Sequence, residues 1–157
     1  MTPAIELLKK HHIPHQVYEY QHDPATASYG LEAAEKLGQN PAQVFKTLVI
    51  SLDHKQLAVA ILPVISQLNM KLAAKALGAK KAEMANAQEV ARTTGYVMGG
   101  VSPLGQKKHL PTVLDSSAAD FAEIYVSAGR RGLEIAVTAT DLLQLTAGRM
   151  AELSQKE

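Results

Sequence analysis

The 157-residue chain contains no cysteine and no tryptophan, and only 4% of its residues are aromatic. Without cysteine it forms no disulfide, iron–sulfur cluster or thiolate zinc site, and it has no thiol nucleophile of its own. This absence suits a reducing cytoplasm, which is the location that we expect. Because aromatic side chains are scarce, aliphatic side chains must fill the core.

An excess of charge of one sign and long apolar runs are lacking as well. The net charge is +1, which is too small for wrapping long nucleic acid, although contact with one end of an RNA remains possible. No apolar run approaches the roughly 18 residues of a membrane span, and the first residues do not have the basic-then-apolar order of a signal peptide. We therefore expect neither a membrane nor DNA as a partner.

The composition that is present is that of a globular protein, with 46% hydrophobic and 20% charged residues. No repeat, linker or low-complexity block divides the chain, so we predict one domain spanning residues 1–157. Strands recur with helices between them, and two close hairpins argue against a purely parallel sheet. The predicted fold class is therefore α+β.

Apolar periodicity, capping residues and turn signals predict where the elements lie. Gly38 is expected to end the second helix in a left-handed cap, and the polar residues 154–157 are expected to fray. Helices are predicted at 2–11, 28–37, 68–77, 87–93 and from 140 onward, and strands at 15–20, 44–50, 56–63, 112–114, 124–127 and 133–137.

Lys46 is the one cation in an otherwise apolar predicted strand. Alternate residues of a strand point to the same side, so Lys46 shares a face with aliphatic residues such as Val44 and Leu48. A cation in that setting needs a partner or access to water. Two interpretations follow: the lysine extends into solvent at the end of the strand, or it stands at the mouth of a pocket that receives an anion.

Residues 95–103 form a second unusual segment, because adjacent Gly99 and Gly100 are followed three residues later by Pro103. Such a backbone can present successive N–H groups to an anion or a polarised carbonyl and act as an oxyanion hole. A plain turn between strands also explains the pattern. A phosphate-binding P-loop over residues 100–107 is excluded, because it requires a Gly-Lys-Ser/Thr ending, whereas here Gln106 separates Gly105 from Lys107 and Lys108 follows Lys107.

Side chains suited to an RNA end occur elsewhere. Arg130 and Arg131 lie in the turn of the last predicted hairpin, where a guanidinium group can match phosphate oxygens or simply face solvent. Tyr20 and Tyr29 flank a predicted turn, and each can stack on a base or cap the core.

Metal and cofactor sites are not expected. Pro14 interrupts the histidine cluster at residues 11–15, and no carboxylate or cysteine completes a ligand set there. Paired carboxylates do not stand out, and a Ser/His/Asp arrangement cannot be recognised from spacing alone.

Residues 45–48, 94–108 and 124–133, together with 2–4 and 20–24, resemble the YbaK family of bacterial trans-editing proteins. The resemblance covers nearly the whole chain in the expected order and extends to the editing domain of bacterial prolyl-tRNA synthetase. It implies a mixed, largely antiparallel, barrel-like sheet with surrounding helices. It also implies hydrolysis of the ester in Cys-tRNA(Pro), which arises when prolyl-tRNA synthetase mischarges cysteine.

The same resemblance implies the partners and the site. The partners are the 3′ end of an aminoacylated tRNA and, transiently, prolyl-tRNA synthetase, with no cofactor and no metal. Tyr29 stands where relatives often carry Phe, and Glu134 stands where some carry Asp. The implied catalytic residues are Lys46, Gly99, Gly100, Val101 and Ser102, and the implied substrate-binding residues are Tyr20, Tyr29, Thr47, Pro103, Ser127, Gly129, Arg130 and Glu134.

In this family the thiol of the substrate is thought to attack its own ester, while the matching lysine holds the phosphate or ribose side of the terminal adenosine. Three alternatives stay open. The chain edits another small amino acid on tRNA, it binds an aminoacyl-tRNA or a nucleotide without catalysis, or it regulates a synthetase.

Overall fold

The computed structural model describes residues 1–155, and within them the elements alternate between helices and strands. The helices are α1 (Pro3–Lys10), α2 (Tyr29–Leu37), α3 (Met70–Ala76), α4 (Ala87–Thr94), α5 (Ala139–Thr146) and the short 3-10 helix η1 (Ser116–Asp120). The strands are β1 (Gln16–Glu19), β2 (Phe45–Leu52), β3 (Gln56–Pro63), β4 (Ala82–Met84), β5 (Thr112–Asp115), β6 (Ile124–Arg130), β7 (Leu133–Val137) and β8 (Arg149–Ala151).

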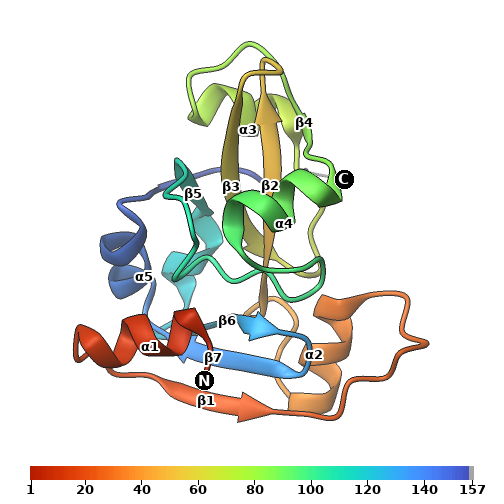
Figure 1. Cartoon of the computed structure of the whole chain (residues 1–157), viewed down its shortest axis with the longest axis vertical. Coiled ribbons are helices and arrows are strands. Elements are labelled where there is room, and N and C mark those ends of the chain that lie inside the picture. Colours follow the sequence, from red (N-terminus) through yellow and green to blue (C-terminus); the bar gives the residue numbers. More distant parts are fainter. Residues whose placement is uncertain (156–157) are drawn as a thin grey trace.

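Two sheets carry the architecture. The larger has the order β4-β2-β3-β5-β8, in which β2 and β3 form a long antiparallel hairpin and β3, β5 and β8 run parallel. The smaller has the order β1-β7-β6 and is antiparallel throughout. In Figure 1 the β2–β3 hairpin follows the long axis of the molecule, and the smaller sheet lies across its lower end.

The two sheets meet just before β2 begins. Val44 forms an isolated parallel bridge with Tyr125 of β6, and the Tyr125 N–H donates to the Gln43 carbonyl at 3.1 Å.

The α+β class and the mixed, largely antiparallel sheet are therefore confirmed. The sheets do not close into a barrel, because β1, β4 and β8 are edge strands within the part of the chain described.

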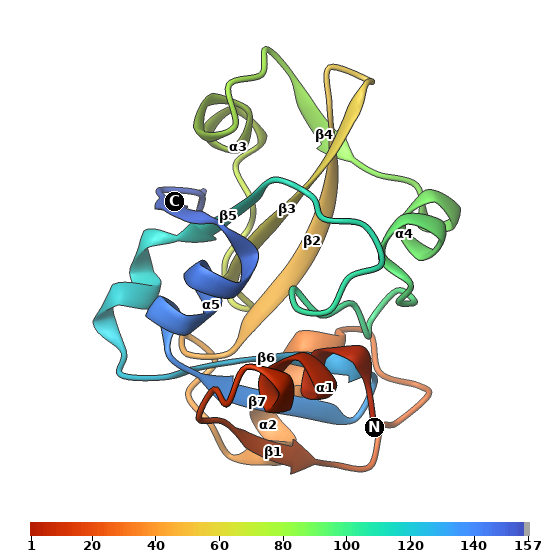
Figure 2. The ribbon, with the colours of Figure 1, turned by 60° about the vertical axis from the view of Figure 1, so that its left-hand side comes forward.

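Aliphatic side chains fill the core, as the lack of aromatic residues predicts. Apart from Phe45, the largest fully buried side chains are leucines and isoleucines. Leu8 of α1 is among them, and α1 runs along the smaller sheet in both ribbon views (Figures 1 and 2). No helix among residues 1–155 is long and apolar enough to cross a membrane.

Local capping explains where the helices begin and end. The hydroxyls of Thr2 and Ser28 accept from the amides of the first turns of α1 and α2, and Gly38 ends α2 with φ +66°. These predicted boundaries are confirmed. The third helix starts at Met70, later than predicted, because the Asn69 side chain caps it and holds the preceding residues outside the helix.

The fraying predicted for residues 154–157 is wrong for the two residues described there. Ser154 forms an isolated antiparallel bridge with Leu68, and the Gln155 N–H donates to the Gln67 carbonyl at 2.7 Å. Backbone pairing, which polar composition does not reveal, holds this segment. Lys156 and Glu157 lie outside the described residues. Strands β4 and β8 were not predicted, because each is three residues long and lies at an edge.

We expect the Tyr96 hydroxyl to matter for stability. Tyr96 is buried, its hydroxyl donates to the Leu104 carbonyl at 2.6 Å, and burial raises its pKa to about 12. Tyr96→Phe leaves that carbonyl without its donor in a dry environment and should lower the free energy of unfolding by about 1–3 kcal/mol in urea titrations. Tyr18→Phe removes a hydroxyl whose bond to Gln16 is exposed to water, so it should lower this free energy by less than Tyr96→Phe does. Equal losses in both variants would contradict this account.

Candidate active site

A cavity of about 310 Å³ lies where the start of β2 faces the smaller sheet and the beginning of α2. Eight of the thirteen predicted site residues line it: Tyr20, Tyr29, Lys46, Thr47, Gly99, Val101, Ser127 and Glu134. They come from segments spread over more than a hundred positions of the sequence. The remaining lining residues are Ala27, Ser28, Gly30, Ala33, Phe45, Leu48 and Met98.

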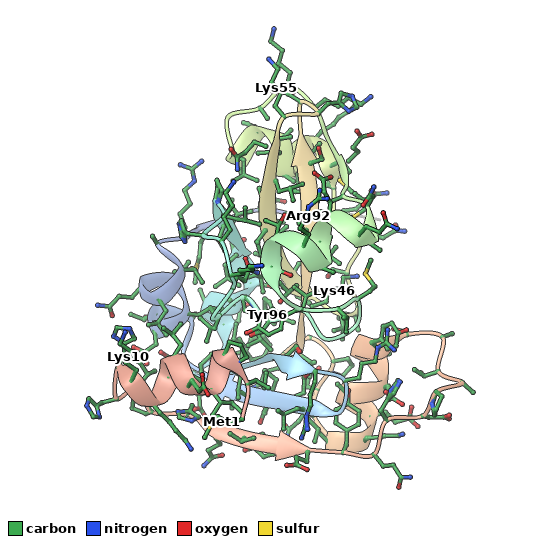
Figure 3. All side chains as sticks on the ribbon, in the orientation of Figure 1. Met1, Lys10, Lys46, Lys55, Arg92 and Tyr96 are labelled. Carbon is green, nitrogen blue, oxygen red and sulfur yellow. The ribbon has the colours of Figure 1, made fainter. Side chains whose placement is uncertain are left out.

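Lys46 lies in the wall of this cavity, toward the end of β2 nearest the smaller sheet (Figure 3). Its Nζ donates to the Ser66 carbonyl at 2.7 Å, and burial lowers the pKa of the ammonium. Of the two interpretations of this lysine, the structure therefore favours the one that puts it at a pocket. A single neutral carbonyl does not balance its charge, so the ammonium can still bind an anion.

Glu134 is the one carboxyl group among the lining residues that the structure describes. It lies on β7 opposite Ser127 and is only 7% exposed. Burial raises its pKa to about 8, so the carboxyl is mostly protonated at neutral pH and can donate a hydrogen bond. Tyr20 lines the same cavity, and burial together with the charge of Glu134 raises its pKa to about 12.

Two hydroxyl groups of the cavity differ in how they are bonded. Among the described residues, none bonds the buried Thr47 Oγ1. The Ser127 Oγ accepts from the Gly129 N–H at 3.2 Å. A buried polar atom without a partner is unfavourable. A ligand that forms a hydrogen bond with the Thr47 hydroxyl would therefore satisfy it.

The glycine-rich loop reaches the cavity with some of its residues. Gly99 and Val101 line it. The Gly100 N–H donates to the Val97 carbonyl at 2.9 Å, so this amide is used within the turn. A Cβ on Gly100 would lie 2.8 Å from the Arg130 Cα, which means that an alanine there pushes against the β6–β7 turn.

Five predicted site residues lie outside the lining: Gly100, Ser102, Pro103, Gly129 and Arg130. Ser102 and Pro103 are buried. Gly129 has φ +114°, and a Cβ there would lie 2.6 Å from the Tyr96 ring. Arg130 is exposed, with an Nη2 3.8 Å from a Glu19 oxygen. The roles of all thirteen residues stay predictions.

A buried ion cluster next to the cavity was not predicted. The Glu32 side chain is 4% exposed, and it accepts from His22, Lys36 and the Asp23 amide. Burial acts to raise its pKa, but these hydrogen bonds outweigh it and hold the pKa at about 2. The sequence signal that could have revealed this cluster is a carboxylate between Leu31 and Ala33 in an otherwise apolar helix segment.

A model of the aminoacyl-tRNA editing domain matches residues 23–145. The chain belongs to this family. The resemblance to YbaK-type proteins is thereby confirmed. The match leaves out only the first 22 residues and the C-terminal end, so it includes every residue of the cavity lining except Tyr20.

Individual relatives of this editing domain agree with the family match. The chain is 39% identical to a candidate Cys-tRNA(Pro)/Cys-tRNA(Cys) deacylase, EbsC of Enterococcus faecalis, over 99% of this chain and 94% of that protein. It is 35% identical to a proline–tRNA ligase of Shouchella clausii, over 64% of this chain and 18% of the ligase. A solved structure, described as a candidate trans-editing enzyme for prolyl tRNA synthetase, superposes with a TM-score of 0.82 at 27% identity, covering 98% and 93% of the two chains.

Glu134 should give the stability of this editing domain a characteristic dependence on pH. The carboxyl has a pKa of about 8 when folded and 4.5 as its ordinary value, so unfolding between these values releases a proton. The free energy of unfolding should therefore fall as the pH rises from 4.5 toward 8. In Glu134→Gln this fall should be absent, and the variant should gain stability relative to the wild type with rising pH.

Urea titrations at several pH values between 4.5 and 8 measure this difference. Glu35→Gln, at an exposed position of α2, is the matched control and should keep the wild-type pH dependence. A Glu134→Gln curve parallel to that of the wild type would contradict a raised carboxyl pKa.

Proposed function

We propose that this chain is a trans-editing hydrolase that deacylates mischarged Cys-tRNA(Pro). The name of its 39% identical relative EbsC includes this substrate. The cavity supports the proposal because it combines a cation, a carboxyl group and a glycine-rich backbone within about 310 Å³. This volume suits a small aminoacyl group and its ribose better than a large side chain.

The observation that carries the proposal is the lack of a nucleophile with its base in the cavity. The chain has no cysteine, and no histidine is among the lining residues that the structure describes. A serine or threonine nucleophile needs an adjacent general base. No side-chain base bonds these hydroxyls among the described residues: the Ser28 Oγ caps α2, the Ser127 Oγ accepts from a backbone amide, and the Thr47 Oγ1 has no partner. The cavity is therefore suited to a substrate that brings its own nucleophile.

Cysteine on tRNA is such a substrate. Its sulfur attacks the ester carbonyl carbon, and the bond from that carbon to the ribose oxygen breaks. The thiol proton goes to the ribose oxygen, which leaves as the tRNA hydroxyl, and the amino acid leaves as a thiolactone that water then hydrolyses. The protein has only to position the reacting atoms and stabilise the oxyanion, which can supply roughly 7–11 kcal/mol and about 3 kcal/mol respectively.

A cation, the loop backbone and a pair of hydrogen-bonding side chains have distinct roles in this mechanism. Lys46 binds the phosphate or ribose side of the terminal adenosine. The backbone at Gly99 and Val101 faces the ester carbonyl. The protonated Glu134 and the unpaired Thr47 hydroxyl supply hydrogen bonds to the polar atoms of the aminoacyl group.

Selection of tRNA(Pro) requires a partner in this proposal. A net charge of +1 provides little attraction for the body of a tRNA. The likeness to part of a proline–tRNA ligase and to a candidate trans-editing enzyme for prolyl tRNA synthetase makes that synthetase the proposed partner. The chain then acts in the cytoplasm, in a transient complex that delivers the aminoacylated 3′ end.

Lys46→Ala should lower kcat/KM for Cys-tRNA(Pro) about 100-fold or more, because one charged contact with the substrate is lost. The fold should persist, since the variant loses a single hydrogen bond to Ser66. Lys55→Ala is the matched control, because Lys55 is exposed at the opposite end of the β2–β3 hairpin (Figure 3). A folded Lys46→Ala protein with wild-type activity would overturn the anchoring role.

The identity of the amino acid tests the nucleophile. tRNA(Pro) charged with serine or alanine should be deacylated at least about 100-fold more slowly than tRNA(Pro) charged with cysteine, because positioning cannot act on a thiol that is missing. Deacylation is measured with and without prolyl-tRNA synthetase. Equal rates for the three esters would indicate an activated water in place of the substrate thiol.

A further inference from the structure

Three separate segments of the chain meet at Gly99. This residue has φ +85°, and a Cβ there would lie 2.7 Å from the Arg131 Nε and 2.8 Å from two carbons of the Tyr29 ring. Tyr29 is the first residue of α2, and Arg131 lies in the turn between β6 and β7. The glycine-rich loop, α2 and this turn are therefore packed together without room for a side chain on Gly99.

Arg131 joins the other two segments. Its guanidinium carbon lies 4.5 Å from the centroid of the Tyr29 ring. Its Nε and Nη2 donate to the Met98 carbonyl at 3.1 and 2.6 Å. A planar guanidinium can stack on a ring and direct two donors to one acceptor at the same time, which a lysine ammonium cannot do. Tyr29 and Met98 both line the cavity, whereas Arg131 lies outside the lining.

The turn that carries Arg131 is itself held in place. The Tyr20 N–H donates to the Gly132 carbonyl at 3.0 Å, and a Cβ on Gly132 would lie 2.7 Å from the Tyr20 carbonyl oxygen. The register of β6 against β7 shifts between Ser127 and Arg130, and such bulges redirect side chains. Arg130 consequently faces Glu19 at the surface, while Arg131 reaches the loop.

Tyr29 has a second support. Its ring centroid lies 5.7 Å from that of His22, and the His22 Nδ1 lies 2.7 Å from a Glu32 oxygen. Glu32 is buried and is also bonded by Lys36 and by the Asp23 amide, so His22 belongs to a hydrogen-bonded cluster. The Tyr29 ring is thus held by His22 as well as by Arg131.

We infer that Arg131 is a positioning residue of the editing reaction. It sets the distance between two walls of the cavity, the Tyr29 ring and the Met98–Gly99 segment, so that a bound aminoacyl ester is held in a reactive geometry. This inference rests on the proposed function. Loss of Arg131 removes no group that contacts the substrate, but it loosens two of the walls around it. A displacement of about 1 Å at a reacting centre can lower the rate about 100-fold.

The test compares Arg131→Ala and Arg131→Lys with Arg92→Ala, which removes an exposed arginine of α4 (Figure 3). For each variant, kcat and KM are measured on Cys-tRNA(Pro) in the presence of prolyl-tRNA synthetase, together with amide hydrogen exchange of residues 97–101 and thermal unfolding. Arg131→Ala should lower kcat about 10- to 100-fold and change KM less than about threefold. Exchange in residues 97–101 should be faster.

The lysine variant separates positioning from charge. Arg131→Lys keeps the charge and most of the stem, and it should recover folding without recovering kcat, because one ammonium cannot stack and donate twice. If Arg131→Ala unfolds, the kcat of Arg131→Lys alone tests whether Arg131 is a positioning residue. Arg92→Ala should match the wild type in every measurement.

Three results would overturn the inference. They are an unchanged kcat in folded Arg131→Ala, a raised KM with unchanged kcat, and full recovery of kcat by lysine. The second and third would make Arg131 a binding cation for the nucleic acid. If the wild type and Arg131→Ala deacylate Cys-tRNA(Pro) equally well, only this inference is contradicted. If the wild type is inactive on every ester, the proposed function is contradicted instead.

Discussion

The junction between the two sheets is the constraint on which the site depends. Val44 pairs with Tyr125, and this bridge holds the first residues of β2 against the smaller sheet. Lys46 and Thr47 follow closely in the chain, and they line the same cavity as Ser127 and Glu134. Without this contact the same side chains would belong to two unrelated surfaces. The cavity is therefore a product of how the sheets join, more than of any one loop.

Burial then tunes Lys46 and Glu134, two ionisable groups of the cavity, in opposite directions. It lowers the pKa of Lys46 and raises that of Glu134, so that each is shifted toward its neutral form. Desolvation is the shared cause, because a charge is stabilised less by a protein interior than by water. Outside the lining, Glu32 shows the opposite outcome, since three hydrogen bonds compensate its burial and keep it ionised. The site thus combines a cavity whose two groups are shifted toward their neutral forms with a neighbouring carboxylate that hydrogen bonds keep charged.

Much of the fold was predictable because its signals are local. The helix starts near Thr2 and Ser28, the left-handed Gly38 and the hairpin from β2 to β3 depend on neighbouring residues and were predicted correctly. Elements held by distant partners were missed or misjudged. Strands β4 and β8 exist because longer strands offer them an edge. Residues 154 and 155 are ordered because the segment before α3 pairs with them.

The features of the site likewise divide into those that local sequence reveals and those that depend on distant segments. The chain's lack of cysteine, the exceptional lysine of β2 and the pattern of glycines are properties of the sequence. The lysine and the glycines belong to the segments whose resemblance suggested the family, and that resemblance in turn implied a substrate-supplied nucleophile. Which of two adjacent arginines reaches the glycine-rich loop, which glycine amide is already used, and which carboxylate is ionised depended on folding. These outcomes follow from a register shift in β6, a turn at Val97 and the hydrogen bonds to Glu32. Hydrogen-bond direction and desolvation arise between segments far apart in the chain, and no local pattern encodes them.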